Sequence, residues 1–224
     1  MRGNLAYRFT VFCVRAYARV MLKMDIRWHG SLPAGPKLFV ANHPSATDPF
    51  IIHLLSLDHL SVVISGNAFA MPLFGVYLRH MGQICAISGQ GENPMESAGA
   101  RLCAGNSVGI FPEGLVSPQA GGCHPPHSGA ARLAISTGAA VIPIGIYLER
   151  ERNIYLSSKL SGKKTGAYWY LRGPYGMTVG EPMLFTGNVD DQDLVHSVTD
   201  RIMARIRELT EESEQRLRSV PAGA

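Results

Sequence analysis

The chain has 224 residues, of which 46% are hydrophobic and 17% are charged, enough apolar material for a full core with some left for contact with lipid or a long-chain substrate. The formal net charge is +4 and the sequence pI is about 9.0. This modest basic excess suits an anionic membrane surface, carrier protein or phosphorylated substrate, and it is too small and too scattered to indicate a nucleic-acid partner.

The first predicted element is a helix over residues 4–24. Its apolar residues recur at helical spacing, and its basic residues follow spacings of seven, four and four, which places them along one face. This pattern is typical of a helix that lies flat in the headgroup region of a membrane. We therefore predict an amphipathic, membrane-associating segment over residues 1–24; the alternative is a helix packed on its own domain with a solvated basic face. The basic stripe consists of Arg8, Arg15, Arg19 and Lys23.

Strands and helices alternate after this segment. The alternation predicts an α/β fold, a single domain over residues 25–218 with a mixed, largely parallel sheet flanked by helices. Residues 219–224 are expected to form a flexible tail. The predicted strands are Ile26–His29, Lys37–Ala41, Leu60–Ile64, Gln83–Ile87, Val108–Phe111, Val141–Tyr147, Ala167–Arg172 and Met177–Val179. The predicted helices are Asp48–Ser56, Phe74–Met81, Met95–Ala104, Gly129–Thr137 and Asp190–Leu217.

Neither a cleaved signal nor a membrane-spanning helix is expected. The N-terminus lacks an uninterrupted apolar core followed by a small-residue cleavage site, and no long uncharged apolar run occurs. The four cysteines form no C-x-x-C pair, which indicates reduced thiols in a cytosolic protein.

The first group of residues suited to catalysis follows the predicted strand Lys37–Ala41. His43 lies in the turn, and Asp48 with Pro49 opens a helix. Loops beyond the carboxyl ends of strands bind ligands in open α/β sheets, so the two side chains can meet there. A carboxylate on one imidazole nitrogen fixes the tautomer and leaves the other nitrogen free to accept a proton from an alcohol. The structural alternatives are a simple helix cap for Asp48 and a surface loop position for His43.

Two further segments follow apolar strands. Phe111-Pro112-Glu113-Gly114 combines a residue that lacks a donor with one that permits a sharp turn, which holds Glu113 at the edge of the sheet. That carboxylate could hold an acceptor hydroxyl or pair with a basic group, or it could be an exposed side chain in a strand-ending turn. The segment 141–146 is a buried strand in which Pro143 is expected at a bulge or a sheet edge.

Together these segments resemble the glycerolipid acyltransferase family typified by 1-acylglycerol-3-phosphate acyltransferase, over roughly residues 5–180. Asn42, His43 and Asp48 are similar to its N-H-x4-D block. The second block of the family is similar to Pro72 to Gly75 with Gly82. Its F-P-E-G block is similar to residues 111–114, and its V-I-P block is similar to residues 141–143. Their order and spacing make the match specific.

The resemblance implies that His43 deprotonates the acceptor hydroxyl with Asp48 as its partner. The oxygen then attacks the thioester of acyl-CoA or acyl-carrier protein. Glu113 and Gly114 would lie at the acceptor site, with no metal and no cofactor required. We predict the substrate-binding residues to be Asn42, Phe111, Pro112, Glu113, Gly114 and Pro143. The implied place of action is the cytoplasmic face of a membrane, as a peripheral protein.

Several basic residues of phosphate-accepting members are missing. The Asp-Arg pair that usually ends the second block is replaced by Ile87-Ser88, and the third block continues with Leu115-Val116 where an arginine is usual. Apolar residues and serine cannot replace the bidentate contact of arginine with a phosphate. We therefore expect the acceptor to be a neutral, zwitterionic or amino-acid-headed lysolipid, or a specialised metabolite. Candidate substitute cations are Arg79, Arg101 and Arg132.

Three alternatives stay open. The chain could be an ordinary 1-acylglycerol-3-phosphate acyltransferase with substituted phosphate contacts, or a non-catalytic lipid-binding protein of the same fold. It could also be a hydrolase in which the same histidine activates water, although no G-x-S-x-G motif is present.

Overall fold

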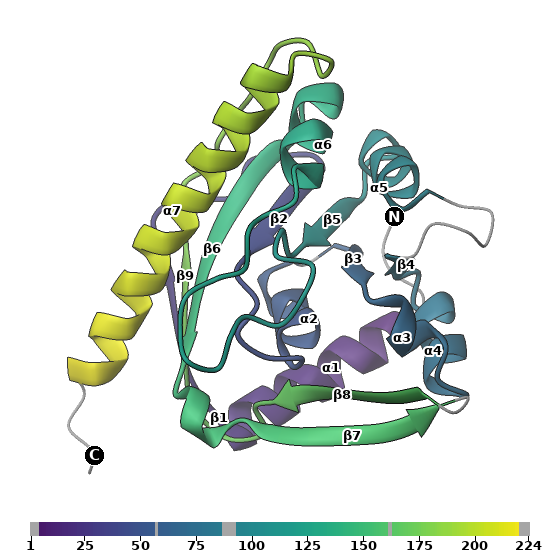
Figure 1. The fold of residues 1–224 in the computed structure, drawn as a ribbon, viewed down its shortest axis with the longest axis vertical. Helices are drawn as coiled ribbons and strands as arrows, with labels where there is room; N and C mark the ends of the chain where they lie inside the picture. The colour runs from purple at the N-terminus through teal and green to yellow at the C-terminus, as the bar shows by residue number, and fades with distance from the viewer. Residues whose placement is uncertain (1–4, 57, 87–92, 161–162, 220–224) are drawn as a thin grey trace.

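The structure is a computed structural model that describes residues 5–56, 58–86, 93–160 and 163–219 (Figure 1). A seven-stranded sheet has the order β1-β9-β6-β2-β5-β3-β4. All neighbouring strands are parallel except β6 and β9, which are antiparallel. The predicted α/β fold with a mixed, largely parallel sheet is confirmed. The strands are β1 (Leu22–Trp28), β2 (Lys37–Ala41), β3 (Leu60–Ile64), β4 (Ile84–Cys85), β5 (Ser107–Ile110), β6 (Ala140–Leu148) and β9 (Gly173–Val179).

Helices cover both faces of this sheet, and β2 shows how the two layers divide. Leu38 and Val40 pack into the cluster shared with α5, α6 and α7, whereas Phe39 and Ala41 pack into the cluster shared with α1 and α2. Because both faces are covered, β2 is buried at every position. The helices are α1 (Leu5–Met21), α2 (Asp48–Ile51) with the 3-10 turn η1 (Ile52–Leu55), α3 (Gly66–Phe69), α4 (Phe74–His80), α5 (Pro94–Cys103), α6 (Gly129–Thr137), the 3-10 turn η2 (Arg150–Arg152) and α7 (Gln192–Ser219).

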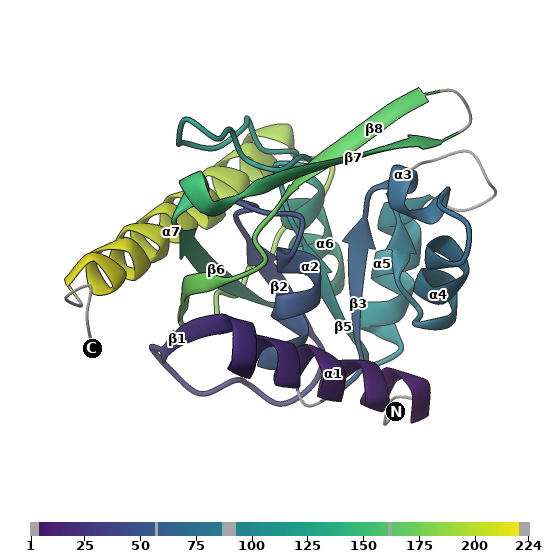
Figure 2. The same ribbon diagram turned by 90° about the horizontal axis from the view of Figure 1, so that it is seen from below.

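Strands β7 (Ile154–Leu160) and β8 (Lys163–Trp169) form a separate antiparallel hairpin. Figure 2 shows the hairpin and α1 on two sides of α2. The predicted strand Ala167–Arg172 overlaps β8 only over residues 167–169, and the prediction missed β7. The Ser-Gly dipeptide at 161–162, between two runs containing aromatic and branched residues, is the sequence signal that could have identified the hairpin.

The N-terminal helix is present but ends three residues earlier than predicted. Leu22 already pairs with Gly173 in the parallel ladder between β1 and β9. Lys23 therefore belongs to β1, and the boundary predicted between residues 24 and 25 falls inside that strand. The pairing with β9, far along the chain, overrides the helical periodicity of residues 22–24.

The two faces of α1 differ in chemistry. On the inner face, the Tyr7 hydroxyl lies 3.2 Å from Nδ1 of His53, and Tyr17 donates to the carbonyl of Leu171 at 2.6 Å. The outer face leaves large apolar side chains in solvent among exposed arginines: Leu5 (82% exposed), Phe9 (66%), Phe12 (66%) and Val20 (79%). Within the described residues, no helix combines the length and apolar character needed to cross a membrane.

Other differences are local. The predicted helix Asp48–Ser56 is a short α-helix continued by a 3-10 turn. α7 runs to Ser219, the first residue of the predicted tail, and residues 220–224 lie outside the described residues, as does Ile87 of the predicted strand Gln83–Ile87.

Candidate active site

The loop 42–48 begins at the carboxyl end of β2, beside the later part of the neighbouring strand β6. Asn42 is buried, and its side-chain amide pairs with the main chain of Ile146 in both directions. It donates to the Ile146 carbonyl at 2.8 Å and accepts from the Ile146 N–H at 2.7 Å. Asn42 thus fixes the start of the loop, and these contacts occupy the amide groups that the predicted role in substrate binding would use.

His43 and Asp48 lie in direct contact. The His43 Nδ1 to Asp48 Oδ2 distance is 3.0 Å, and the side chains are 13% and 0% exposed. A carboxylate offers only acceptors, so in the neutral imidazole this contact favours the tautomer with the proton on Nδ1 and the lone pair on Nε2. The two residues predicted to act together are therefore placed together, and the His43 side chain is mostly but not fully buried.

Asp48 has two further donors. The main-chain N–H of Ser45 donates to Oδ2 at 2.8 Å, and the hydroxyl of Tyr175 donates to Oδ1 at 2.6 Å. Burial and the nearby charge of Asp48 hold the pKa of the Tyr175 hydroxyl well above its usual range, so this group stays protonated and donates. Tyr175 comes from β9, and sequence reasoning missed it because no motif links it to the loop.

Glu113 is buried, and its carboxylate accepts three hydrogen bonds. Oε1 accepts from the N–H of His43 at 3.0 Å and from the hydroxyl of Ser117 at 2.7 Å, while Oε2 accepts from the N–H of His124 at 2.8 Å. Phe111 stacks on the His43 ring with centroids 4.4 Å apart. Glu113 is thus close to the predicted base but contacts its main chain, and the carboxylate is enclosed by this chain's own donors.

The turn that follows β5 depends on Pro112 and Gly114. The Pro112 carbonyl accepts from the N–H of His127 at 2.8 Å. Gly114 has φ of +67°, and a Cβ there would lie 3.2 Å from the His127 ring. Both the left-handed backbone and the close ring favour glycine. These residues bring the 115–128 loop back against the start of the site.

Pro143 lies away from this group of residues. It pairs with Val40 in the interior strand β6, so of the two predicted positions, a bulge or a sheet edge, the edge was wrong. The Pro143 carbonyl accepts a hydrogen bond from the N–H of Gly180 at 2.9 Å. Gly180 lies just beyond the end of β9, so the lack of an N–H in proline removes no hydrogen bond from the β6–β9 ladder. A Cβ at Gly180 would lie 3.0 Å from the Pro143 ring and 2.8 Å from Leu209 of α7, which places the ring on the α7 side of the sheet.

The hairpin base fixes the middle of the loop. Tyr170 donates its N–H to the Ser45 hydroxyl at 2.8 Å, and its carbonyl accepts from Thr47 at 3.0 Å. Asn153, at the start of the hairpin, donates to the Pro44 carbonyl at 3.2 Å. The loop that carries His43 is therefore held from both strands of the hairpin.

The candidate substitute cations have other partners. Arg79 donates to the Phe69 carbonyl and lies over the Phe69 ring. Arg132 donates to the Val189 carbonyl and to Gln192. Arg101 lies beside His59, whose pKa falls chiefly through burial and partly through this arginine. None of these contacts involves the 42–48 loop.

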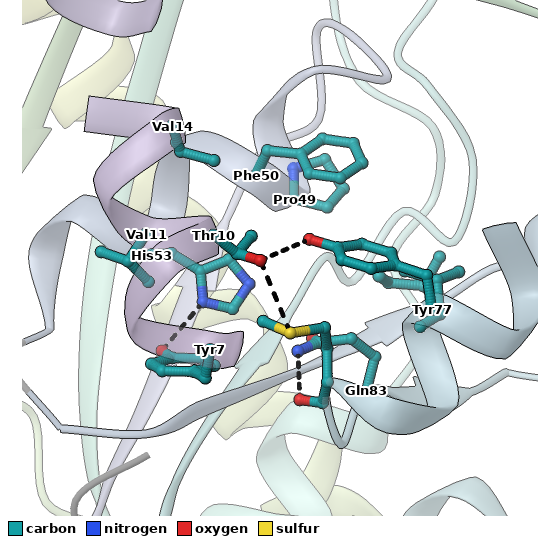
Figure 3. A pocket seen from close by; sticks show the side chains of 12 residues that line it. Tyr7, Thr10, Val11, Val14, Pro49, Phe50, His53, Tyr77 and Gln83 are labelled. Atoms are coloured by element: carbon teal, nitrogen blue, oxygen red, sulfur yellow. Dashed lines mark hydrogen bonds between the residues drawn. The ribbon is translucent and has the colours of Figure 1, made fainter. Parts of the chain in front are cut away.

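A narrow pocket lies between α1, η1 and α4, on the far side of Pro49 and Phe50 from the loop (Figure 3). His53 lies in its wall, and burial together with His59 lowers the pKa of His53 to about 4. The cavity volume is about 10 Å³, roughly what one water molecule needs. At that size the pocket holds no alkyl chain in this conformation.

Comparison with known proteins gives a consistent family assignment. The family model named Acyltransferase matches residues 25–147, more than half of the chain. A protein of Pseudomonas aeruginosa named lyso-ornithine lipid O-acyltransferase is 30% identical over 133 residues, which cover 58% of this chain and 50% of that protein. The chain thus matches about half the length of this curated relative.

Among solved structures, the fold is similar to the crystal structure of the 1-acyl-sn-glycerophosphate acyltransferase from Thermotoga maritima. The TM-score is 0.60 with 19% identity, covering 91% of this chain and 78% of that one. At this identity the similarity concerns the fold alone.

Proposed function

The chain belongs to the acyltransferase family, as its resemblance to the glycerolipid acyltransferases indicates, and from this premise we propose that it transfers a fatty acyl group from a thioester donor to the hydroxyl of an amino-acid-headed lysolipid. The observation that carries the proposal is the 3.0 Å contact between His43 Nδ1 and the buried Asp48 carboxylate, with the His43 side chain 13% exposed. A base oriented by a carboxylate and open on one side is suited to an incoming alcohol.

In the proposed reaction, Nε2 of His43 takes the proton of the acceptor hydroxyl. The oxygen attacks the thioester carbonyl, the carbon–sulfur bond breaks, and the imidazolium returns its proton to the departing thiolate. Asp48 keeps the ring in the required tautomer and stabilises the imidazolium. Its own position depends on the donors from Ser45 and Tyr175.

Two observations support an amino-acid-headed acceptor. The arginines that phosphate-accepting relatives carry are replaced by Ile87-Ser88 and Leu115-Val116, and the candidate substitutes have contacts elsewhere. The Pseudomonas relative is named for a lyso-ornithine lipid, whose headgroup carries both an amine and a carboxylate. A zwitterionic headgroup needs less positive charge from the protein than a phosphate dianion does.

We place the protein on the cytoplasmic face of a membrane as a peripheral protein. The outer face of α1 supports a membrane contact, because Phe9 and Phe12 are 66% exposed and lie between the exposed Arg8 and Arg15. Apolar groups at the acyl boundary with cations at the headgroups are the arrangement of an interfacial helix. The donor is acyl-CoA or an acyl-carrier protein.

The test is a comparison of acceptors at matched concentrations, with each donor in turn. We expect acyl transfer to lyso-ornithine lipid to exceed transfer to lysophosphatidate by at least about tenfold, since losing a charged contact costs over 1.4 kcal/mol. A strong preference for lysophosphatidate would instead identify an ordinary glycerol-phosphate enzyme. Release of free fatty acid without an acyl product would identify a hydrolase.

A further inference from the structure

A second pocket lies at the base of the hairpin and has a composition that the proposed reaction does not use. It has a volume of about 200 Å³ and is lined by two arginines and two aliphatic residues, Arg152, Arg172, Ile154 and Leu171. Ile154 and Leu171 are 49% and 36% exposed, and both arginines are exposed as well. Cations beside aliphatic side chains match an anionic group attached to a hydrocarbon.

The pocket is built by chain segments that meet around Gly173. Its φ is +124°, and a Cβ there would lie 3.1 Å from the stem of Arg152 and 2.5 Å from the Tyr170 hydroxyl. Glycine therefore allows the Arg152 stem to lie against the turn between β8 and β9. On the other side, Tyr17 of α1 donates to the Leu171 carbonyl at 2.6 Å. The fold thus holds η2, this turn and α1 together.

The two guanidinium groups differ from the other arginines of this region in how much of their bonding capacity is used. Within the part of the chain that the structure describes, Arg172 makes no hydrogen bond or ion pair. Arg152 pairs through Nε with the exposed carboxylate of Glu149. The two terminal nitrogens of Arg152 remain available to bind an anion. By contrast, Arg150 donates to the carbonyls of Pro118 and Gly122.

We propose that this pocket binds the carboxylate or phosphate oxyanion of a lipid headgroup, with Arg152 and Arg172 as its ligands. Planar guanidinium groups bind such oxyanions by paired hydrogen bonds, and the aliphatic side chains contact the first carbons of the lipid. The lipid is either the acyl acceptor itself or a lipid of the bilayer on which α1 rests; the first source rests on the proposed function.

Neighbouring contacts make both sources possible. Asn153, next to Arg152, donates to the Pro44 carbonyl, and Tyr170, next to Leu171, donates to Ser45, so the pocket borders the loop that carries His43. Tyr17 connects the same pocket to the helix with the exposed apolar face. A headgroup held here is therefore close to both the candidate base and the predicted membrane contact.

The first experiment measures binding without catalysis. Calorimetry with decyl phosphate and decanoate, below their micelle concentrations, compares the wild type, the double variant R152A/R172A and the matched control R201A, an exposed arginine on α7 that stacks on Phe185. We expect the double variant to bind both anions at least about tenfold more weakly, and R201A to bind like the wild type. Equal binding by all three proteins, or equal binding of uncharged decyl maltoside, would overturn the proposal.

The second experiment identifies the source. If the acceptor occupies the pocket, R152A/R172A raises KM for a short-chain, monomeric lyso-ornithine lipid in the absence of vesicles. If a bilayer lipid occupies it, KM is unchanged and binding to vesicles containing phosphatidylglycerol falls several-fold, with little change on pure phosphatidylcholine. No change in either assay would refute a lipid ligand. A wild type that transfers no acyl group would defeat the proposed function and leave the calorimetric result standing.

Discussion

His43 and His53 lie ten residues apart, on either side of α2, and their surroundings are opposite. His43 has a carboxylate on one nitrogen, an aromatic ring stacked on it and a side chain that is 13% exposed. His53 is buried, lies 3.2 Å from the Tyr7 hydroxyl, and has a pKa lowered to about 4 by burial and by His59. The loop 42–48 thus pairs its histidine with a carboxylate, whereas η1 holds a buried histidine whose charged form is disfavoured.

The comparison shows that burial alone does not make a base. Removing an imidazole from water disfavours its charged form, and a nearby opposite charge offsets this. Asp48 provides that charge beside His43, while Tyr7 offers a neutral hydroxyl beside His53. Substitutions on the two sides of this comparison should differ widely in their effect on acyl transfer.

Replacing His43 by Ala has the largest expected effect. Loss of the base should lower kcat for acyl transfer by about 10³-fold, within the range for general-base catalysis. The free energy of unfolding should fall by about 1–3 kcal/mol, because a mostly buried ring is removed from Phe111 and Asp48 loses one partner. Steady-state transfer and thermal denaturation measure the two quantities. Near-normal transfer by a folded H43A protein would show that His43 takes no part in the reaction. If the chain is instead a non-catalytic lipid-binding protein, the wild type transfers no acyl group and H43A keeps the lipid affinity of the wild type.

Asp48→Asn separates the orientation of the ring from its presence. Asparagine keeps the shape but loses the charge, and its amide would face the donors that now reach Asp48 from Ser45 and Tyr175. We expect kcat to fall by about 10²-fold, because His43 loses the charge that stabilises its protonated form. If D48N transfers as fast as the wild type, Asp48 acts only at the start of α2.

Much of the site could be predicted where the chemistry is local. The bounds of β2, β3 and α6 agree with the predicted residues, since apolar runs with clear breaks specify them. The His43–Asp48 contact spans five residues and could be anticipated from one loop. The Tyr175–Asp48 bond spans 127 residues, and nothing in the sequence near either residue indicates it.

Other differences have the same physical origin. The end of α1, the hairpin and the interior place of Pro143 all depend on which distant strands pair. The FPEG turn was located correctly, but the direction of Glu113 toward the His43 main chain depends on how β2 and β5 lie side by side. The pattern of apolar residues identifies the helices and strands, whereas the order of the strands in the sheet decides which side chains come into contact.

Glu113→Gln tests whether the second carboxylate acts through the His43 main chain. Glutamine keeps one acceptor oxygen but turns an amide toward one set of donors, so a buried hydrogen bond is lost at a cost of about 1–3 kcal/mol in unfolding free energy. We expect a rate loss of roughly tenfold with KM for the acceptor little changed. A large rise in acceptor KM with unchanged stability would show instead that Glu113 contacts the acceptor.

Tyr175→Phe removes one donor from Asp48 and keeps the ring packing. The carboxylate then interacts more strongly with protonated His43, so the pH at which the rate is half-maximal should rise. We expect a rate loss of only several-fold at pH 7, which a complete pH–rate profile distinguishes from a general loss of stability. An unshifted profile would make Tyr175 a packing residue.

His53→Gln should change acyl transfer at pH 7 by less than about twofold, and its effect lies in the pH dependence of stability. The folded pKa of His53 is about 4 and the unfolded value is 6.5. Between pH 6.5 and about pH 4, the unfolded chain therefore binds a proton at His53 that the folded protein does not bind. The free energy of unfolding of the wild type falls as the pH is lowered through this range. Between pH 7 and pH 5 this one group should cost about 2 kcal/mol.

Urea denaturation of the wild type and H53Q at pH 7 and pH 5 measures this difference. Glutamine does not titrate, so H53Q should lose about 2 kcal/mol less than the wild type over this interval, even if it is less stable at both values. The contribution of His59, whose pKa is also lowered, remains in both proteins and cancels in the comparison. Equal losses in the two proteins would mean that folding does not lower the pKa of His53, and the contrast with His43 would then rest on Asp48 alone.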